Sequence, residues 1–456
     1  MKTFSIEKLT LFAIIVIGAF YLFVFPPNSG PDESNHLRAA YQNVNVVMGE
    51  VSSDINSLSM RAADERLIEG YPHFPTRETY QEFFDNLFVP LPAGGNEIVD
   101  VVRDSGVPHP YIYFPQTAGI LVARAFDMNP EWLYLFGRIF NLIFFAVCVW
   151  LSIKIAPIGK GVFALVALYP MTMHLAASMN SDVYSIALAF LVLAQYLRIA
   201  YSDAPAKIPD LFILLATMAL LGPPKVVFIP VMMLAFFLPN RCFHSKTFAW
   251  IFRAIVAAVC LATIYIAWYV FINRTAGGVP VVEAGVGELN TFEHIFADPV
   301  LFAKTCWRTI LMHFEFYYHS LIGSELGWLE ISINKILLNV FMALSVLGAF
   351  KYKLQEKTLL LRDRIQFPII FLIMALATAV VMFVSWTPIG SWDIRGLQGR
   401  YFLPFWPLFL LFIARWQKPV RPKWLSDRNM VLIASMLHII VLVTAFLFIY
   451  GREIPV

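Results

Sequence analysis

Residues 9–36 read LTLFAIIVIGAFYLFVFPPNSGPDESNH, an apolar run followed at once by a polar segment. The run 9–25 is long enough for a helix to cross a bilayer, whose hydrocarbon core is about 30 Å thick. It is long for the apolar core of a signal peptide, and it ends in Pro26-Pro27 without a small-residue cleavage site. The sequence therefore predicts a retained first membrane span with the polar segment just outside it.

The composition is typical of an integral membrane protein. Of the 456 residues, 59% are hydrophobic and only 14% are charged, whereas a soluble domain is about half apolar and a quarter charged. These values exclude an ordinary cytosolic enzyme, a disordered chain and a nucleic-acid-binding protein. The four cysteines form no CxxC pair and no recognisable disulfide framework.

Apolar segments suitable for membrane spans recur along the whole chain. Together with the first, they predict an all-α polytopic membrane protein of about eleven helices, in a single domain over residues 1–456. The later segments are 132–153, 161–178, 183–201, 209–222, 226–239, 248–272, 334–350, 367–386, 402–416 and 430–450. The pieces 209–222 and 226–239 are short, and they form either two thin spans or one re-entrant pair.

The positions of lysine and arginine orient this bundle. More than half of the 34 basic residues fall in alternate short connections, and such connections face the cytoplasm. The N-terminus is then cytoplasmic, and the loops 28–131 and 273–333 are periplasmic. In the first of these loops we expect an amphipathic helix over 32–50. We also expect an interfacial helix over 111–126, because that segment is apolar but short for a span.

The polar segment after the first span holds the sharpest chemical signal. Asp32 and Glu33 are adjacent carboxylates, and His36 follows Asp32 at i+4 on the same face of a helix. Such a group is suited to general-base catalysis or, with other ligands, to holding a divalent cation. The alternative is an acidic N-cap and first turn that only stabilise the helix.

Further candidates lie on the same predicted outer face, in a Pro-rich aromatic stretch, at the start of a span, in a turn and before a late span. Each has a simpler interpretation. In the same order, these are an aromatic belt at the membrane interface, a helix cap, a lysine side chain that snorkels to the headgroups, and an arginine that anchors the chain to the headgroups. Two of them are arginines, which oppose the positive-inside tendency and whose planar fork suits phosphate. The residues concerned are His109, Tyr111, Asp182, Lys225, Arg395, Arg400 and Tyr401.

Several segments, taken in order, resemble the GT-C superfamily of integral-membrane glycosyltransferases, and most closely the bacterial domain-of-unknown-function family 2142. They are PPNSGPDESNHLRAAYQ (26–42), HPYIYFPQTAGIL (109–121), GRIFNLIFF (137–145), LYPMTMHLAASMNSDVYSIALAFLVL (168–193), GPPK (222–225) and QGRYFLPFWPLFLLF (398–412). The resemblance is collinear over nearly the whole chain and depends on the order of the segments rather than on one motif.

The resemblance implies a GT-C-like bundle in the bacterial inner membrane, with an active site that faces the periplasm. It implies a sugar donor linked to polyprenyl phosphate and an envelope glycan as acceptor, such as O-antigen, another lipopolysaccharide sugar or a wall polymer. It assigns the catalytic base to Asp32 or Glu33. It leaves open whether a divalent cation is needed, with Asp32, Glu33 and His36 as its ligands. The substrate contacts that we expect are His36, His109, Tyr111, Asp182, Lys225, Arg395, Arg400 and Tyr401.

Two other functions are compatible with the sequence. A transporter or flippase of a lipid-linked glycan needs charges within several spans and internal symmetry, whereas the polar residues here gather in the outer loops. A scaffold would use the loop 28–131 for protein contacts. The chain also lacks a Walker A loop, a G-x-G-x-x-G turn, HExxH and G-x-S-x-G. ATP-driven transport and a Rossmann nucleotide-sugar site therefore have no support.

Overall fold

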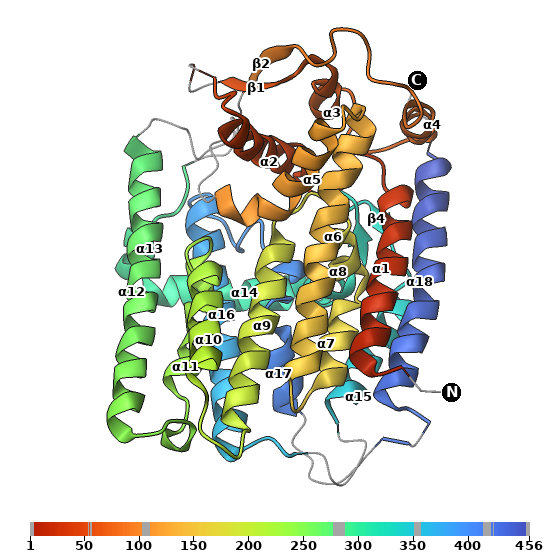
Figure 1. The fold of residues 1–456 in the computed structure, drawn as a ribbon. Helices are drawn as coiled ribbons and strands as arrows, with labels where there is room; N and C mark the ends of the chain where they lie inside the picture. The colour runs from red at the N-terminus through yellow and green to blue at the C-terminus, as the bar shows by residue number, and fades with distance from the viewer. Residues whose placement is uncertain are drawn as a thin grey trace.

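Long apolar helices form the body of the molecule (Figure 1). The computed structural model describes residues 4–52, 54, 57–102, 110–276, 288–350, 357–413, 421–422 and 424–452. Within these residues, 6 helices are long and apolar enough to cross a membrane. They are α1 (Ile6–Val24), α6 (Pro130–Ile155), α9 (Asp182–Ala200), α12 (Lys246–Ala276), α16 (Leu361–Trp386) and α18 (Asp427–Tyr450). The chain is therefore a mostly helical membrane protein, as predicted.

The predicted number of about eleven spans is not confirmed. The expected span 161–178 is divided into α7 (Lys160–Ala167) and α8 (Pro170–Ala176). Proline has no N–H group, so Pro170 cannot donate the hydrogen bond that would continue α7. Residues 402–416 form only η5 (Gly399–Phe402) and α17 (Trp406–Ile413) within the described part of the chain.

Two short helices, α10 (Ile208–Leu221) and α11 (Ile229–Phe236), run along α9. They are separated by η3 (Val226–Phe228), and η4 (Asn240–Cys242) follows α11. At one end of the pair, Lys225 contacts Asp182, the first residue of α9. At the other end, Arg241 donates a hydrogen bond of 2.9 Å to the carbonyl of Ala200, the last residue of α9. The segment from Lys225 to Arg241 therefore extends from one end of α9 to the other, although α10 (14 residues) and α11 (8 residues) are both shorter than α9 (19 residues).

The second large loop contains a helix that the sequence did not predict. Helix α14 (Pro299–Ile322) follows α13 (Phe292–Ala297) and lies across the long helices (Figure 1). A short hairpin of β3 (Glu325–Leu326) and β4 (Ile331–Ser332) then leads to α15 (Lys335–Ala349). Hydropathy does not reveal α14, because Lys304, Arg308 and Glu315 interrupt its apolar pattern.

The first loop forms a cap over one end of the bundle (Figure 1). Helices α2 (Glu33–Met48) and α5 (Phe114–Ala125) occur where the sequence predicts helices, and η2 (Pro110–Tyr113) precedes α5. The other helical elements of the cap are η1 (Ala62–Asp64), α3 (Arg66–Glu69) and α4 (Arg77–Asn86). An antiparallel ladder of β1 (Ser57–Arg61) and β2 (Ile98–Val102), which was not predicted, completes it. A buried ion pair of 2.7 Å between Arg61 and Asp64 stabilises the turn after β1.

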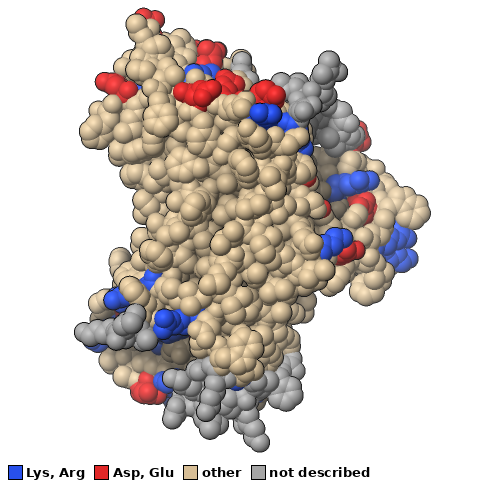
Figure 2. Space-filling view, turned by 90° about the vertical axis from the view of Figure 1, so that its right-hand side faces the viewer, with Lys and Arg blue, Asp and Glu red and all other residues tan. Residues whose placement is uncertain are grey.

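Helix α9 is the best packed of the long helices. In its apolar window 89% of the residues are buried, against 28% in both α12 and α16. Figure 2 shows charged side chains at the two ends of the molecule, a broad uncharged belt between them and one charged protrusion. This distribution is the one that a lipid bilayer requires around a membrane protein. Residues at the start of α9 are thus held by the most rigid part of the bundle.

Candidate functional site

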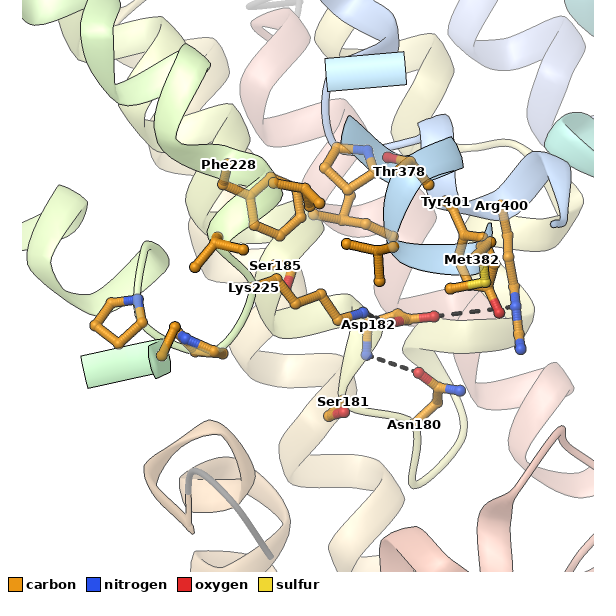
Figure 3. A pocket seen from close by; sticks show the side chains of 18 of the residues that line it. Asn180, Ser181, Asp182, Ser185, Lys225, Phe228, Thr378, Met382, Arg400 and Tyr401 are labelled. Carbon is orange, nitrogen blue, oxygen red and sulfur yellow. Dashed lines mark hydrogen bonds and ion pairs between the residues drawn. The ribbon is translucent and has the colours of Figure 1, made fainter. Parts of the chain in front are cut away.

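A cavity of about 550 Å³ lies beside the first turn of α9. It is bounded by the start of α2, the turn 222–225, α16 and η5. Polar side chains, shown in part in Figure 3, form part of its lining: Asp32, His36, Asp182, Lys225, Arg400 and Tyr401. Much of the rest of the lining is apolar, with Ile186, Phe228, Val381 and Met382 among its residues. The cavity therefore offers both charged and apolar surface to a ligand.

Asp182 lies between two cations in this cavity (Figure 3). Lys225 donates a hydrogen bond to Oδ1 of Asp182, and Nε of Arg400 lies 4.0 Å from Oδ2. The side-chain oxygen of Asn180 accepts a hydrogen bond of 2.6 Å from the backbone N–H of Asp182. Asp182 thus faces two positive charges, and Asp32 adds a second carboxylate to the lining, so two cations and two carboxylates meet at this cavity.

The Arg400 guanidinium is buried without a full set of partners. Its side chain is only 6% exposed, and neither Nε nor Nη1 makes a hydrogen bond within the described residues. A buried donor without an acceptor costs about 1–3 kcal/mol, and a charged donor costs more. Gly399 fixes this position, because a Cβ there would lie 2.1 Å from the carbonyl oxygen of Tyr317 in α14. The guanidinium is therefore held at the cavity with hydrogen-bonding capacity to spare.

Asp32 faces the cavity from the start of α2 without capping the helix. Its side chain is exposed and makes no hydrogen bond to the N–H groups of α2. Its backbone is in the left-handed region, with φ of 57°, where Asp is better tolerated than most residues. The Asp32 carboxylate therefore does not cap α2, and the capping interpretation is wrong for this residue. The left-handed backbone turns its side chain away from the N–H groups of the helix.

His36 is the imidazole that the i+4 spacing predicted beside Asp32. It lines the cavity, and its Nδ1 lies 2.8 Å from the hydroxyl oxygen of Tyr113. Burial lowers the pKa of His36 below its usual value, and the neighbouring carboxylates of Asp182 and Asp32 only partly oppose this effect. The lowered pKa favours the neutral imidazole, which can exchange hydrogen bonds with a ligand.

Glu33 is adjacent to Asp32 in the sequence, but the two differ in burial, in position relative to the cavity and in their partners. It is fully buried, does not line the cavity and is paired with Arg138, whose Nη2 lies 2.7 Å from Oε2. Burial alone would raise the pKa of Glu33, but Arg138 and two backbone N–H groups lower it overall. Within the described residues no group of three or more His, Cys, Asp or Glu side chains could hold a metal ion. The cation site of Asp32, Glu33 and His36, which the sequence left open, is thus not formed by these residues, because Arg138 and the backbone occupy the Glu33 carboxylate.

The comparison with protein families agrees with the predicted resemblance at the level of the family. The model of the family described as "Predicted membrane protein (DUF2142)" matches residues 15–409, which is most of the chain. The chain belongs to the DUF2142 family. No curated protein and no solved structure matches it.

Besides Glu33, three of the predicted site residues of this DUF2142 protein are not at the cavity or lie outside the described residues. Arg395 is 64% exposed and lies 3.3 Å from the carboxylate of Asp393, away from the cavity. Tyr111 packs with the ring of Tyr184 and does not line the cavity. His109 lies outside the described residues. The structure brings together Asp32, His36, Asp182, Lys225, Arg400 and Tyr401.

Sequence reasoning missed the residues that hold these groups in place. Arg138 binds Glu33, and Asn141 donates to the carbonyl of Ser178 at 2.8 Å. Gln116 donates to the carbonyl of Met179 at 3.1 Å. An arginine inside a predicted span is a signal that was available, since ionisable residues in spans are costly and pair with a partner. The spacing i, i+3 of Arg138 and Asn141 would then have placed both on one face of α6.

Proposed function

We propose that this DUF2142 protein is a membrane glycosyltransferase of the GT-C type. In this proposal it transfers a sugar from a polyprenyl-phosphate-linked donor to a cell-envelope glycan, at the periplasmic face of the bacterial inner membrane. The positive-inside distribution of lysine and arginine supports this orientation, with the N-terminus in the cytoplasm.

The observation that carries the proposal is the buried Arg400 guanidinium at the cavity. Two of its nitrogens have no hydrogen-bond partner within the described residues, and Lys225 adds a second cation to the lining. Arginine binds phosphate with two parallel hydrogen bonds, which lysine cannot reproduce. The apolar part of the lining, which includes Phe228 and Met382, suits the hydrocarbon chain of a polyprenyl phosphate.

The proposed reaction is a displacement at the anomeric carbon of the donor. Asp32 takes the proton from an acceptor hydroxyl, and the oxygen forms a new bond to the anomeric carbon. The bond from that carbon to the phosphate oxygen breaks, and polyprenyl phosphate leaves with the electron pair. Arg400 and Lys225 stabilise the negative charge that develops on the leaving group. Such a general base typically contributes 10²–10⁴-fold to the rate, and a donor of this kind needs no nucleotide outside the cell.

The test compares Arg400 with Arg395 as a matched control, because Arg395 is exposed and lies away from the cavity. Binding of undecaprenyl phosphate to the protein in lipid nanodiscs is measured by native mass spectrometry. We expect Arg400→Lys to raise the apparent Kd about 10-fold and Arg400→Ala to raise it further, whereas Arg395→Lys leaves it unchanged. Equal binding by all three variants would remove the phosphate site from the proposal.

The same test is extended to transfer in cells. Envelope glycan is compared by mass spectrometry between cells with the wild-type protein and cells with Asp32→Asn. Asparagine keeps the size of aspartate and tolerates the left-handed backbone, so we expect a loss of modification of at least about 100-fold with normal expression. A scaffold would retain full modification with Asp32→Asn.

A further inference from the structure

The carboxylate of Glu33 joins two segments that are far apart in the sequence. Its Oε2 accepts a hydrogen bond of 2.8 Å from the N–H of Gly30, two residues before Asp32. Its Oε1 accepts a hydrogen bond of 2.8 Å from the N–H of Met179, three residues before Asp182. One buried side chain thus binds the backbone next to both cavity carboxylates.

Arg138 completes the connection from α6. Its Nε and Nη2 donate to the two oxygens of Glu33 at 3.0 and 2.7 Å. The same guanidinium donates to the carbonyls of Phe25 and Pro26, at 2.5 and 2.9 Å, where α1 ends. Arg138 is 1% exposed and Glu33 is fully buried. The pair therefore links the end of α1, the start of α2 and the loop before α9 to one helix.

Stability alone does not account for this pair. A buried ion pair pays a large desolvation cost, and its replacement by apolar residues of similar size is often neutral or stabilising. What apolar side chains cannot replace are the hydrogen bonds that the Glu33 carboxylate accepts from Gly30 and Met179. The specific contribution of the pair is therefore the relative position of the two segments that it joins.

We infer that Glu33 and Arg138 are positioning residues, which hold Asp32 and Asp182 in a fixed position relative to each other at the cavity. This inference rests on the proposed function for its effect on transfer, but the connection itself is testable without any activity. Glu33 is then not the catalytic base. It is the residue that fixes the position of the base relative to Asp182, the carboxylate beside Lys225 and Arg400.

Hydrogen exchange of the backbone amides in residues 177–181 tests the connection directly. The variants are Glu33→Leu, which has no acceptor, and, as a matched control, Asp64→Leu, which breaks a second buried ion pair in the cap. Loss of a hydrogen bond to a charged group accelerates exchange about 10- to 100-fold. We expect this change at Met179 in Glu33→Leu and none in Asp64→Leu. Unchanged exchange in Glu33→Leu, or an equal change in both variants, would overturn the inference.

A double variant, Glu33→Leu with Arg138→Met, separates position from stability. Both partners become apolar, so we expect the thermal stability to return towards that of the wild type. The hydrogen bonds to Gly30 and Met179 are still absent, so exchange stays fast and envelope-glycan modification stays at least about 10-fold low. Recovery of modification together with stability would overturn the positioning role. If wild-type cells show no modification at all, the proposed function fails, and the exchange measurements still decide on the connection.

Discussion

At each end of α9 an aspartate lies beside an arginine, Asp182 in α9 itself and Asp363 in α16, and the two clusters differ in how far their polar groups are satisfied. At the C-terminal end, Asp363 is fully buried and accepts hydrogen bonds from the hydroxyls of Tyr196 and Tyr201, at 2.6 and 2.8 Å. Arg362 donates to the same carboxylate at 2.8 Å. At the N-terminal end, Arg400 retains two nitrogens without hydrogen bonds in the described part of the chain.

This difference separates a structural cluster from one that is prepared for a ligand. Nearly all buried polar groups in native proteins have a partner, so each exception requires an explanation. Around Asp363 every charge is matched by the protein itself, and the cluster ties α9 to α16. Arg400, by contrast, lines a cavity. An anion that enters this cavity can supply the hydrogen-bond acceptor that the described residues do not provide. Charge alone does not identify a site; unsatisfied charge beside an open volume does.

The largest expected effect concerns the two ends of α9 and the side of the membrane on which each end lies. In a cysteine-free background, Glu97→Cys in the cap and Asp203→Cys near the opposite end of α9 are treated with an impermeant maleimide in intact cells with a permeabilised outer membrane. We expect labelling of the first and none of the second, because the positive-inside distribution places the cap outside. The reverse labelling pattern would place the cavity on the cytoplasmic side. That result would exclude both the proposed sugar donor and the proposed glycan acceptor.

The second prediction compares the two aspartates by thermal unfolding in one detergent. Asp363→Ala leaves Arg362 and two buried hydroxyls without their acceptor, so we expect a loss of about 3–5 kcal/mol in stability. Asp182→Ala acts at the cavity, where water replaces the carboxylate, and we expect a loss of about 1 kcal/mol or less. Equal decreases in Tm would contradict the distinction between a satisfied cluster and a ligand site.

The smallest effect concerns a carboxyl group that is buried without a partner but is not beside the cavity. Both oxygens of Glu330 lack a hydrogen bond within the described residues, and burial raises its pKa from 4.5 to about 7. Unlike arginine, this group can lose its charge. The folded protein therefore binds the extra proton below pH 7, and the stability that this proton contributes is lost as the pH rises from about 4.5 through 7.

The variant Glu330→Gln cannot ionise, so it does not share this loss. We expect the Tm of Glu330→Gln, relative to the wild type, to rise by a few degrees between pH 5 and pH 8. A difference in Tm that is the same at both pH values would show that Glu330 does not titrate in this range.

Long apolar runs made most of the helical body predictable. The observed α6, Pro130–Ile155, lies within a few residues of the predicted 132–153, and α18, Asp427–Tyr450, lies within a few residues of 430–450. The break at Pro170 and the transverse α14 were not predicted, because a single-sequence hydropathy pattern does not decide how a mixed or interrupted segment packs. Those choices depend on tertiary contacts, as between Gly399 and the backbone of α14.

The sequence predicted a set of site residues that share the outer face of the membrane protein. It did not predict the role of each residue at the site. Asp32, Asp182 and Arg400 come from distant segments, and only their shared side of the membrane connected them in the sequence. Asp32 and Glu33 were indistinguishable there, because successive residues at the start of a helix point in different directions and packing decides which one is buried. Glu33 is the buried one because it pairs with Arg138, which is 105 residues away in the sequence.

The contact between Gly399 and α14 has a consequence for mutational scanning of this family. A Cβ at position 399 would lie 2.1 Å from the carbonyl oxygen of Tyr317 and 2.3 Å from the backbone nitrogen of Leu321. Every substitution there must push η5 away from α14 and move the neighbouring Arg400 with it. In a library selected for activity, position 399 will therefore accept glycine only and resemble a residue that touches the substrate, although its own atoms have no chemistry to contribute.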